Sequence, residues 1–92
     1  MSGARRAVTI ANRRGLHARA SAKFVTLAAE QPCSVTVQKE SGGDRVTGTS
    51  IMGLMMLGAA MGDTVVISAD GDGAEAAVGA LAGLVEAKFG ED

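Results

Sequence analysis

The hydrophobic pattern of the chain switches repeatedly between the two-residue period of strands and the longer period of amphipathic helices. Strand-like segments are 7–10, 34–38, 45–48 and 63–69, and helix-like segments are 18–30, 51–57 and the stretch after the turn at 70–73. A right-handed crossover from the first strand to the second leaves room for a later strand to insert between them. This β-α-β-β-α-β-α order predicts an α+β fold, in which three helices cover one face of a four-stranded antiparallel sheet.

Local signals mark where the predicted helices begin and end. The first helix begins at His17 and ends before Pro32, because the residue before a proline resists helical dihedral angles. Ser50 can cap the second helix, and Asp72 and Glu75 have the spacing of a capping box for the third. We therefore expect three helices, of which the second is only about two turns long.

The length and composition indicate a single domain that spans residues 1–92. No apolar run approaches the roughly 18 residues of a membrane span, and the start of the chain lacks the apolar stretch of a signal peptide. Cys33 is the only cysteine, so no internal disulfide can form. We expect a monomeric cytoplasmic protein that does not associate with membranes.

Positive charge is concentrated at the start of the chain, around the only histidine, His17. Six basic residues precede the first acidic residue, Glu30, whereas the rest of the chain holds three basic and ten acidic residues. Aromatic residues make up only 2% of the chain and the isoelectric point is near 5.7, so binding to nucleic acid is disfavoured. A basic cluster often forms only a solvated face, but a local anion site is the more economical interpretation here.

The residues around His17 suit a phosphoryl-group acceptor. A helix that begins at position 18 leaves the backbone N–H groups of Ala18 and Arg19 without partners, and the aligned peptide dipoles add positive charge there. A phosphoryl group on the imidazole could accept these N–H groups while the guanidinium of Arg19 approaches it. Positive surroundings favour the neutral, nucleophilic ring, in which either nitrogen could attack, and Gly15 gives a turn that a partner can approach. The alternative role for His17 is that of a polar helix cap.

Two motifs resemble those of a known family. The run Gly-Leu-His-Ala-Arg-x-x-x-x-Phe-Val at 15–25 resembles the active-site signature of the HPr family, the histidine phosphocarriers of the phosphoenolpyruvate-dependent phosphotransferase system. The run at 49–58 is similar to the family's serine-site and second-helix motif, and the resemblance spans residues 5–89. It implies an open-faced β-sandwich and a role in sugar uptake or in nitrogen-linked or metabolic regulation.

The same resemblance implies the roles of individual residues. His17 would receive a phosphoryl group from enzyme I, itself charged by phosphoenolpyruvate, and pass it to an enzyme IIA domain. Arg19 would stabilise the phosphohistidine, and no metal or cofactor would be needed. The family usually has proline where this chain has Ala20, but alanine is well tolerated at this position of a helix, so we expect the site to form.

The second predicted helix has more apolar residues than one face can bury. If Leu54 and Leu57 pack on the sheet, the other apolar side chains turn toward solvent and make a patch of the kind that marks interaction sites. Methionine suits several partners because its flexible thioether repacks, although filling a thin core is the alternative role. We assign the partner-docking surface to Lys23, Ile51, Met52 and Met55.

Ser50 has a structural and a regulatory interpretation. The first is the helix cap described above. The resemblance adds the second, because in some members of the family the matching serine is phosphorylated by a dedicated HPr serine kinase. A phosphate dianion there is tolerated by the helix start but would disturb docking of a partner on the neighbouring apolar patch.

Two other functions compete with that of a phosphoryl carrier. A small phosphate-handling hydrolase could hold its substrate on the loop 12–15, but it would need a positioned base and an enclosed pocket. A regulatory module that docks without chemistry would need neither His17 nor Arg19. We therefore predict a phosphoryl-carrier protein rather than an enzyme that turns over a substrate.

Overall fold

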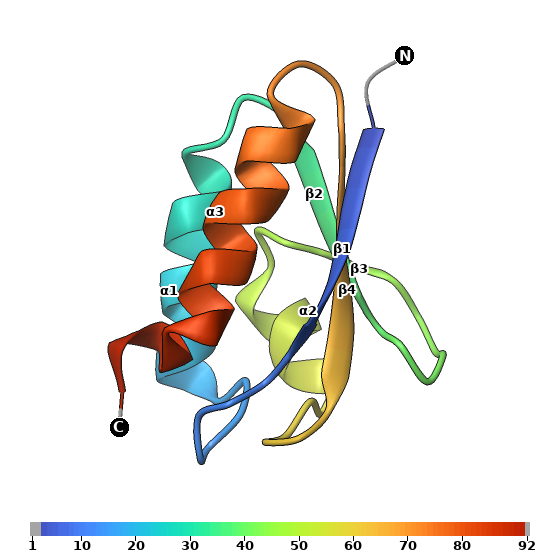
Figure 1. Ribbon diagram of the computed structural model, residues 1–92. Helices are drawn as coiled ribbons and strands as arrows, with labels where there is room; N and C mark the ends of the chain where they lie inside the picture. The colour runs from blue at the N-terminus through green and yellow to red at the C-terminus, as the bar shows by residue number, and fades with distance from the viewer. Residues whose placement is uncertain (1–2, 92) are drawn as a thin grey trace.

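The computed structural model describes residues 3–91, and its strands form one antiparallel sheet (Figure 1). The strands are β1 (Gly3–Thr9), β2 (Ser34–Lys39), β3 (Val46–Thr47) and β4 (Thr64–Asp70), and their order across the sheet is β1-β4-β2-β3. β4 lies between β1 and β2 and pairs antiparallel with both. The predicted insertion of a later strand between the first two is therefore confirmed.

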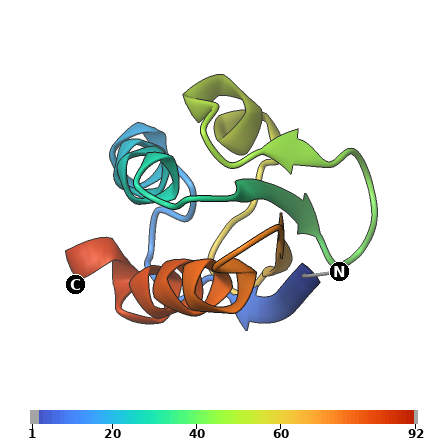
Figure 2. The same ribbon diagram turned by 90° about the horizontal axis from the view of Figure 1, so that it is seen from above.

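Within residues 3–91, the helices lie on one side of this sheet, as the view from above shows (Figure 2). They are α1 (Ala18–Ala29), α2 (Ile51–Met56) and α3 (Ala74–Glu86), and a short 3-10 turn, η1 (Lys88–Gly90), follows α3. Along β4, Val65, Ile67 and Ala69 are buried, whereas the residues between them are partly exposed. This alternation leaves the other face of the sheet open, so the predicted open-faced α+β fold is confirmed.

The helical spacing of α1 turns one side of the helix into the core. Its buried residues are Ala20, Ser21, Phe24 and Ala28. The burial of Ser21 is not predicted by the spacing, and its hydroxyl is satisfied because it donates to the carbonyl of Leu16 over 3.1 Å. Leu27 of α1 and Leu84, further along the chain, are only partly buried and pack at the border of the core.

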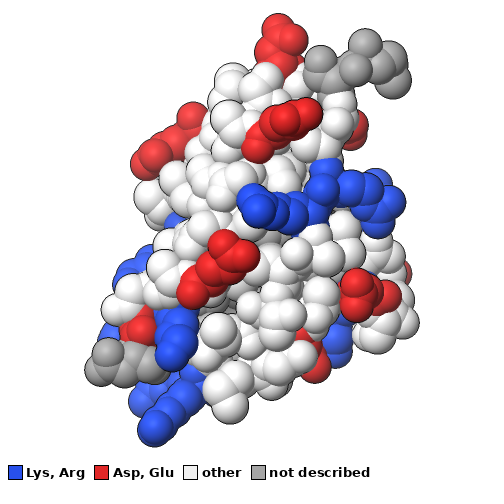
Figure 3. Space-filling view, in the orientation of Figure 1, with Lys and Arg blue, Asp and Glu red and all other residues white. Residues whose placement is uncertain are grey.

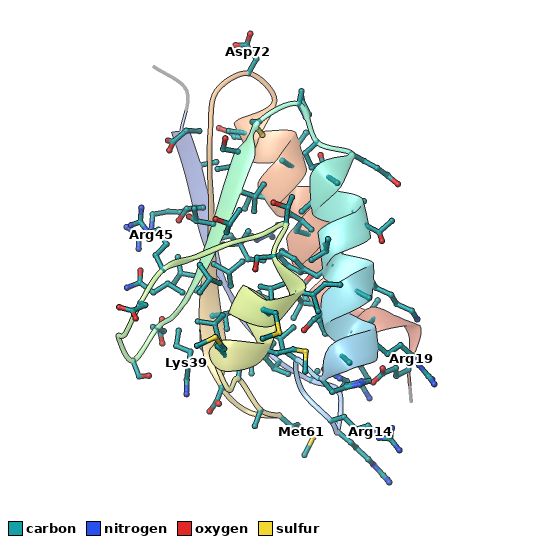
Figure 4. All side chains as sticks on the ribbon, turned by 180° about the vertical axis from the view of Figure 1, so that it is seen from behind. Arg14, Arg19, Lys39, Arg45, Met61 and Asp72 are labelled. Atoms are coloured by element: carbon teal, nitrogen blue, oxygen red, sulfur yellow. The ribbon has the colours of Figure 1, made fainter. Side chains whose placement is uncertain are left out.

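The start of α3 differs from the prediction. The residue before the helix is Gly73, in the left-handed conformation with φ of 80°, and no side chain caps the helix. Because glycine alone enters this conformation without strain, the chain turns into α3 through Gly73, and the capping box of Asp72 and Glu75 is wrong. Asp72 instead lies at the end of the molecule opposite Arg14 and Arg19 (Figure 4).

Two strand boundaries also shift. β1 begins at Gly3, before the alternation of residues 7–10, because its pairing with β4 continues as far as Gly3 and Asp70. β3 is reduced to Val46 and Thr47, which pair with β2 at the edge of the sheet. In the described part of the chain, no helix has the length and apolar character needed to cross a membrane.

Candidate functional site

The loop between β1 and α1 is held by a close backbone contact. Gly15 is buried with φ of 63°, and a Cβ atom at this position would lie 2.4 Å from the carbonyl oxygen of Ala59. The next N–H, that of Leu16, donates to the same carbonyl over 3.0 Å. Gly15 thus allows close packing within the chain, and the expectation that it leaves room for a partner is wrong. This contact fixes the point at which α1 begins.

His17 occupies the cap position of α1. Its backbone is extended, its carbonyl accepts the N–H of Ser21 over 2.9 Å, and its side chain makes no capping hydrogen bond. Among the described residues, no group accepts the N–H groups of Ala18, Arg19 or Ala20. The helix therefore begins as predicted, with alanine at position 20, and presents free donors beside the imidazole.

The imidazole of His17 contacts a carboxylate from the far end of the chain. Its Nε2 lies 2.7 Å from Oε2 of Glu91, and the two side chains are 22% and 18% exposed. The other carboxylate oxygen, Oε1, accepts the Nδ2–H of Asn12 over 3.0 Å. Asn12 is buried, and its Nδ2 also donates to the carbonyl of Gly15 over 2.9 Å. His17 is thus partly covered and oriented, rather than fully exposed.

The environment of Glu91 favours its ionised form. Burial acts to raise the pKa of this carboxyl, but the hydrogen bonds from Asn12 and His17 and the positive charges of His17 and Lys23 outweigh it and lower the pKa. The sequence predicts positive surroundings for the ring of His17, but the structure also places the Glu91 carboxylate 2.7 Å from its Nε2. The surroundings of the ring are therefore of mixed charge. Sequence reasoning identifies Asn12 only as a turn residue, and no local pattern connects His17 to a residue 74 positions later.

The basic side chains around His17 lie at one end of the molecule. In Figure 3 they gather at the lower left, where α1 begins, and Figure 4 shows Arg14 and Arg19 at this same end. Arg19 is exposed, and among the described residues it makes no hydrogen bond or ion pair. Lys23 is differently engaged, because its ammonium donates to the carbonyl of Phe89 over 2.6 Å. Arg19 therefore remains available to a ligand, whereas Lys23 helps to hold the end of the chain.

An apolar surface lies on α2, which packs against α1. Leu54 is fully buried and Leu57 is partly buried, as the division of this helix into two faces predicts. Within residues 3–91, the exposed large apolar residues are Ile51, Met52, Met55, Met56 and Met61. Met56 and Met61, of which Met56 is 79% exposed, are not among the predicted docking residues. Met61 follows α2 in the chain, and Figure 4 shows it at the same end of the molecule as Arg14.

Ser50 caps α2 as its sequence position predicts. Its Oγ accepts the N–H of Gly53 over 3.0 Å, and its carbonyl accepts the N–H of Leu54. The hydroxyl is therefore part of the helix start at the border of the exposed apolar surface. Within residues 3–91, no group of three or more histidine, cysteine or acidic side chains could hold a metal ion.

Comparison with known proteins identifies the family. The model of the PTS HPr component phosphorylation site matches residues 4–87, which is most of the chain. The chain belongs to the HPr family. It is 41% identical to phosphocarrier protein NPr of Shewanella violacea, over 99% of this chain and 98% of that protein, and 44% identical to phosphocarrier protein HPr of Cupriavidus necator, over 94% of each.

The fold agrees with solved structures of the family. The structure of HPr-C-His from Thermoanaerobacter tengcongensis matches with a TM-score of 0.86 and 41% identity, over 100% of this chain and 99% of that one. The chain is thus an HPr-type phosphocarrier, a phosphoryl-transfer protein of the phosphotransferase system. Membership of the family implies enzyme I and enzyme IIA domains as partners.

Proposed function

We propose that His17 is the residue that carries the phosphoryl group, and that it receives the group from enzyme I and passes it to an enzyme IIA domain. The observation that supports this is the helix start itself, where the N–H groups of Ala18 and Arg19 follow His17 and have no acceptor among the described residues. The exposed guanidinium of Arg19, two positions after His17, makes no hydrogen bond or ion pair there either. Together they can bind a dianion with charge-assisted hydrogen bonds. The cytoplasm is the compartment that we propose for this exchange.

The contact with Glu91 supports our assignment of the ring nitrogen that attacks. An ionised carboxylate can only accept hydrogen bonds, so the Nε2 that lies 2.7 Å from Oε2 of Glu91 carries the hydrogen. The neutral ring then has its lone pair on Nδ1. This lone pair forms the bond to phosphorus while the bond between phosphorus and enzyme I breaks, and the donor group keeps that electron pair. Transfer to the enzyme IIA domain repeats the step in the opposite sense, with Nδ1 as the leaving group.

The experiment combines the protein with phosphoenolpyruvate and purified enzyme I and measures intact mass before and after acid treatment. We expect the gain of one acid-labile phosphoryl group, and no gain in the variant His17→Ala, because that variant lacks the nucleophile. An acid-stable product, or the same gain in His17→Ala, would contradict the assignment. A hydrolase would instead consume a small phosphate ester without enzyme I, which the same reaction mixture can test.

Partner docking is proposed for the exposed face of α2 together with the basic end of α1. Ile51, Met52 and Met55 are exposed, and the two methionines have flexible side chains, which suits repacking against two different partners. Met52→Glu should slow transfer from enzyme I without lowering thermal stability, because Met52 is 69% exposed. Ala80→Glu, on an exposed position of α3, is the matched control. Equal rates in the two variants would exclude the docking role of Met52.

Regulation by a serine kinase is proposed for Ser50. A phosphoryl group on its Oγ would stand at the start of α2, next to the exposed Ile51 and Met52, and would have to be desolvated when a partner covers this surface. Ser50→Asp keeps a good capping residue while it adds a charge. We expect this variant to unfold at the same temperature and to accept phosphate from enzyme I more slowly, and an unchanged rate would remove the regulatory role.

A further inference from the structure

The end of the chain is anchored so that Glu91 has a fixed place. Phe89 is almost completely buried, and its backbone is in the left-handed conformation with φ of 54°, which turns the chain back toward α1. The carbonyl of Phe89 accepts the ammonium of Lys23 over 2.6 Å, and the N–H of Glu91 donates to the carbonyl of Lys88 over 2.8 Å. The backbone that leads to Glu91 is thus held at three neighbouring points, so its side chain starts from a fixed position.

The orientation of the Glu91 carboxylate is fixed by Asn12, whose own orientation is fixed by the backbone. The carbonyl of Gly15 can only accept, so the Asn12 side chain must turn its NH2 group toward that carbonyl. The second hydrogen of the same NH2 group points to Oε1 of Glu91, 3.0 Å away. Asn12 is buried, so water does not compete for these hydrogens. The remaining carboxylate oxygen, Oε2, faces Nε2 of His17.

This series of contacts determines the position of a proton. Gly15 orients Asn12, Asn12 orients Glu91, and Glu91 leaves an acceptor facing Nε2 of His17. Nε2 must then be the nitrogen that carries the hydrogen, and Nδ1 must be the nitrogen with the lone pair. The hydrogen bonds that lower the pKa of Glu91 also keep the carboxylate ionised, so its role as acceptor is maintained.

We propose that Glu91 and Asn12 are positioning residues for phosphoryl transfer, which hold the hydrogen of His17 on Nε2 and keep Nδ1 free to attack. This inference rests on the proposed transfer through His17. The proton stays on Nε2 while the bond from Nδ1 to phosphorus forms and breaks, so Glu91 neither gains nor loses a proton. Glu91 is 74 positions from His17 in the sequence, far from the segment that carries the active-site signature.

Glutamine at position 91 provides a sharp test, because it keeps the size of the side chain and changes only its hydrogen bonding. Asn12 presents hydrogens, so the amide oxygen of the new side chain will face Asn12 and its NH2 group will face His17. Nε2 would then have to accept, and the hydrogen would move to Nδ1, the attacking nitrogen. Removal of the side chain in Glu91→Ala leaves both tautomers open. The glutamine variant should therefore be more impaired than the alanine variant.

The experiment measures the rate of phosphoryl transfer from enzyme I and the ¹⁵N chemical shifts of the imidazole in the unphosphorylated proteins. We expect E91A to be roughly 10-fold slower than the unmodified protein, the scale of one charge-assisted hydrogen bond, and E91Q to be slower by at least roughly a further 10-fold. The shifts should place the hydrogen on Nε2 in the unmodified protein and on Nδ1 in E91Q. Glu86→Gln, at an exposed carboxylate near the end of α3, is the matched control and should change neither quantity.

The role of Asn12 is tested by the double variant N12A/E91Q. Without the hydrogens of Asn12, the new amide at position 91 is free to turn its oxygen toward the ring, and the hydrogen should return to Nε2. The inference is overturned if E91Q transfers as fast as the unmodified protein, if its hydrogen stays on Nε2, or if the double variant keeps the tautomer of E91Q. If the unmodified protein gains no phosphoryl group, the proposed function fails, whereas the imidazole shifts still show whether Glu91 and Asn12 hold the hydrogen on Nε2.

Discussion

The two helices that border the apolar surface begin in different ways. At α2, the cap residue serves its own helix, because Oγ of Ser50 accepts the N–H of Gly53. At α1, the cap side chain turns away from its helix, because the ring of His17 contacts Glu91 and leaves the first N–H groups free. A cap side chain that satisfies its own helix cannot also leave those donors for a ligand. The difference separates a helix start built for stability from one built to bind an anion.

The two helix starts are also held in place by different parts of the chain. The capping contact of α2 joins residues three positions apart. The start of α1 depends on residues from elsewhere, since Gly15 packs against Ala59 and the ring meets Glu91. A reactive cap therefore needs external support, which its own helix does not supply. Substitutions at the two helix starts should consequently differ in kind as well as in size.

The largest expected effect is on stability, from Gly15→Ala. The added Cβ would lie 2.4 Å from the carbonyl oxygen of Ala59, in a left-handed conformation that alanine avoids, so the free energy of unfolding should fall by roughly 2–4 kcal/mol. Gly58→Ala, just after α2, is the matched control, because φ there is 66° but nothing lies within 4 Å of the new Cβ. It should lose only about 1–2 kcal/mol. Equal losses in denaturant titrations would show that the contact with Ala59 does not matter.

The next effect is on transfer, from Arg19→Ala. If the guanidinium helps the free donors of α1 to hold the phosphoryl group, its removal should slow transfer from enzyme I by roughly 10–100-fold, the value of a hydrogen bond to a charged group. Arg45→Ala removes the same charge at a position distant from Arg19 in Figure 4. Both variants should unfold at the temperature of the unmodified protein. A similar slowing in both would indicate a general effect of net charge rather than a contact with the phosphoryl group.

A smaller effect is expected at the other helix start, from Ser50→Ala. Loss of the capping acceptor should lower the free energy of unfolding by about 1 kcal/mol. Thr49→Ala, at the exposed neighbouring residue, should change it by less than about 0.5 kcal/mol. Thermal or denaturant unfolding measures both. His17→Ala removes no capping bond, so a loss as large as that of Ser50→Ala would mean that the two helix starts are not as different as the structure indicates.

In the comparison of the two helix starts, the sequence predicts the features that depend on residues close together in the chain. The order of strands and helices follows from hydrophobic period, and the cap of Ser50 follows from a residue type at a fixed distance from a helix start. The position of His17 at the start of α1 follows in the same way. Each of these depends on neighbours within one or two turns, where chain geometry leaves few alternatives.

The parts that the sequence does not predict depend on distant segments. Glu91 and Asn12 come together only because Phe89 fills a place in the core and turns the chain back, and no periodicity signals this contact. From the sequence, Gly15 is predicted to leave space for a partner protein. The residue that it packs against, Ala59, is distant in the sequence, so no local pattern indicates this contact. Even a local signal can be overruled, since the glycine turn at Gly73 replaces the capping box expected at Asp72.

The smallest expected effect is a response to acid that distinguishes the two helix starts. The pKa of Glu91 is lowered in the folded protein, so its contact with His17 stabilises the fold above the ordinary glutamate range and is lost as the pH falls through the lowered value, below 4.5. The groups that face Glu91 and produce this shift are Asn12, His17 and Lys23. The cap of α2 joins a hydroxyl to an N–H and contains no titrating group.

The measurement is an NMR titration that follows the side-chain carboxyl carbon of Glu91 and the amide of Gly53. The Glu91 signal should show a midpoint below 4.5, and the amide of Gly53 should respond less over the same range. In His17→Ala the midpoint should rise, because burial still acts on the carboxyl while one hydrogen bond and one positive charge are gone. A midpoint that is the same in both proteins would mean that the ring and the carboxylate do not meet in solution, and the external support proposed for the start of α1 would be reduced to the packing of Gly15 against Ala59.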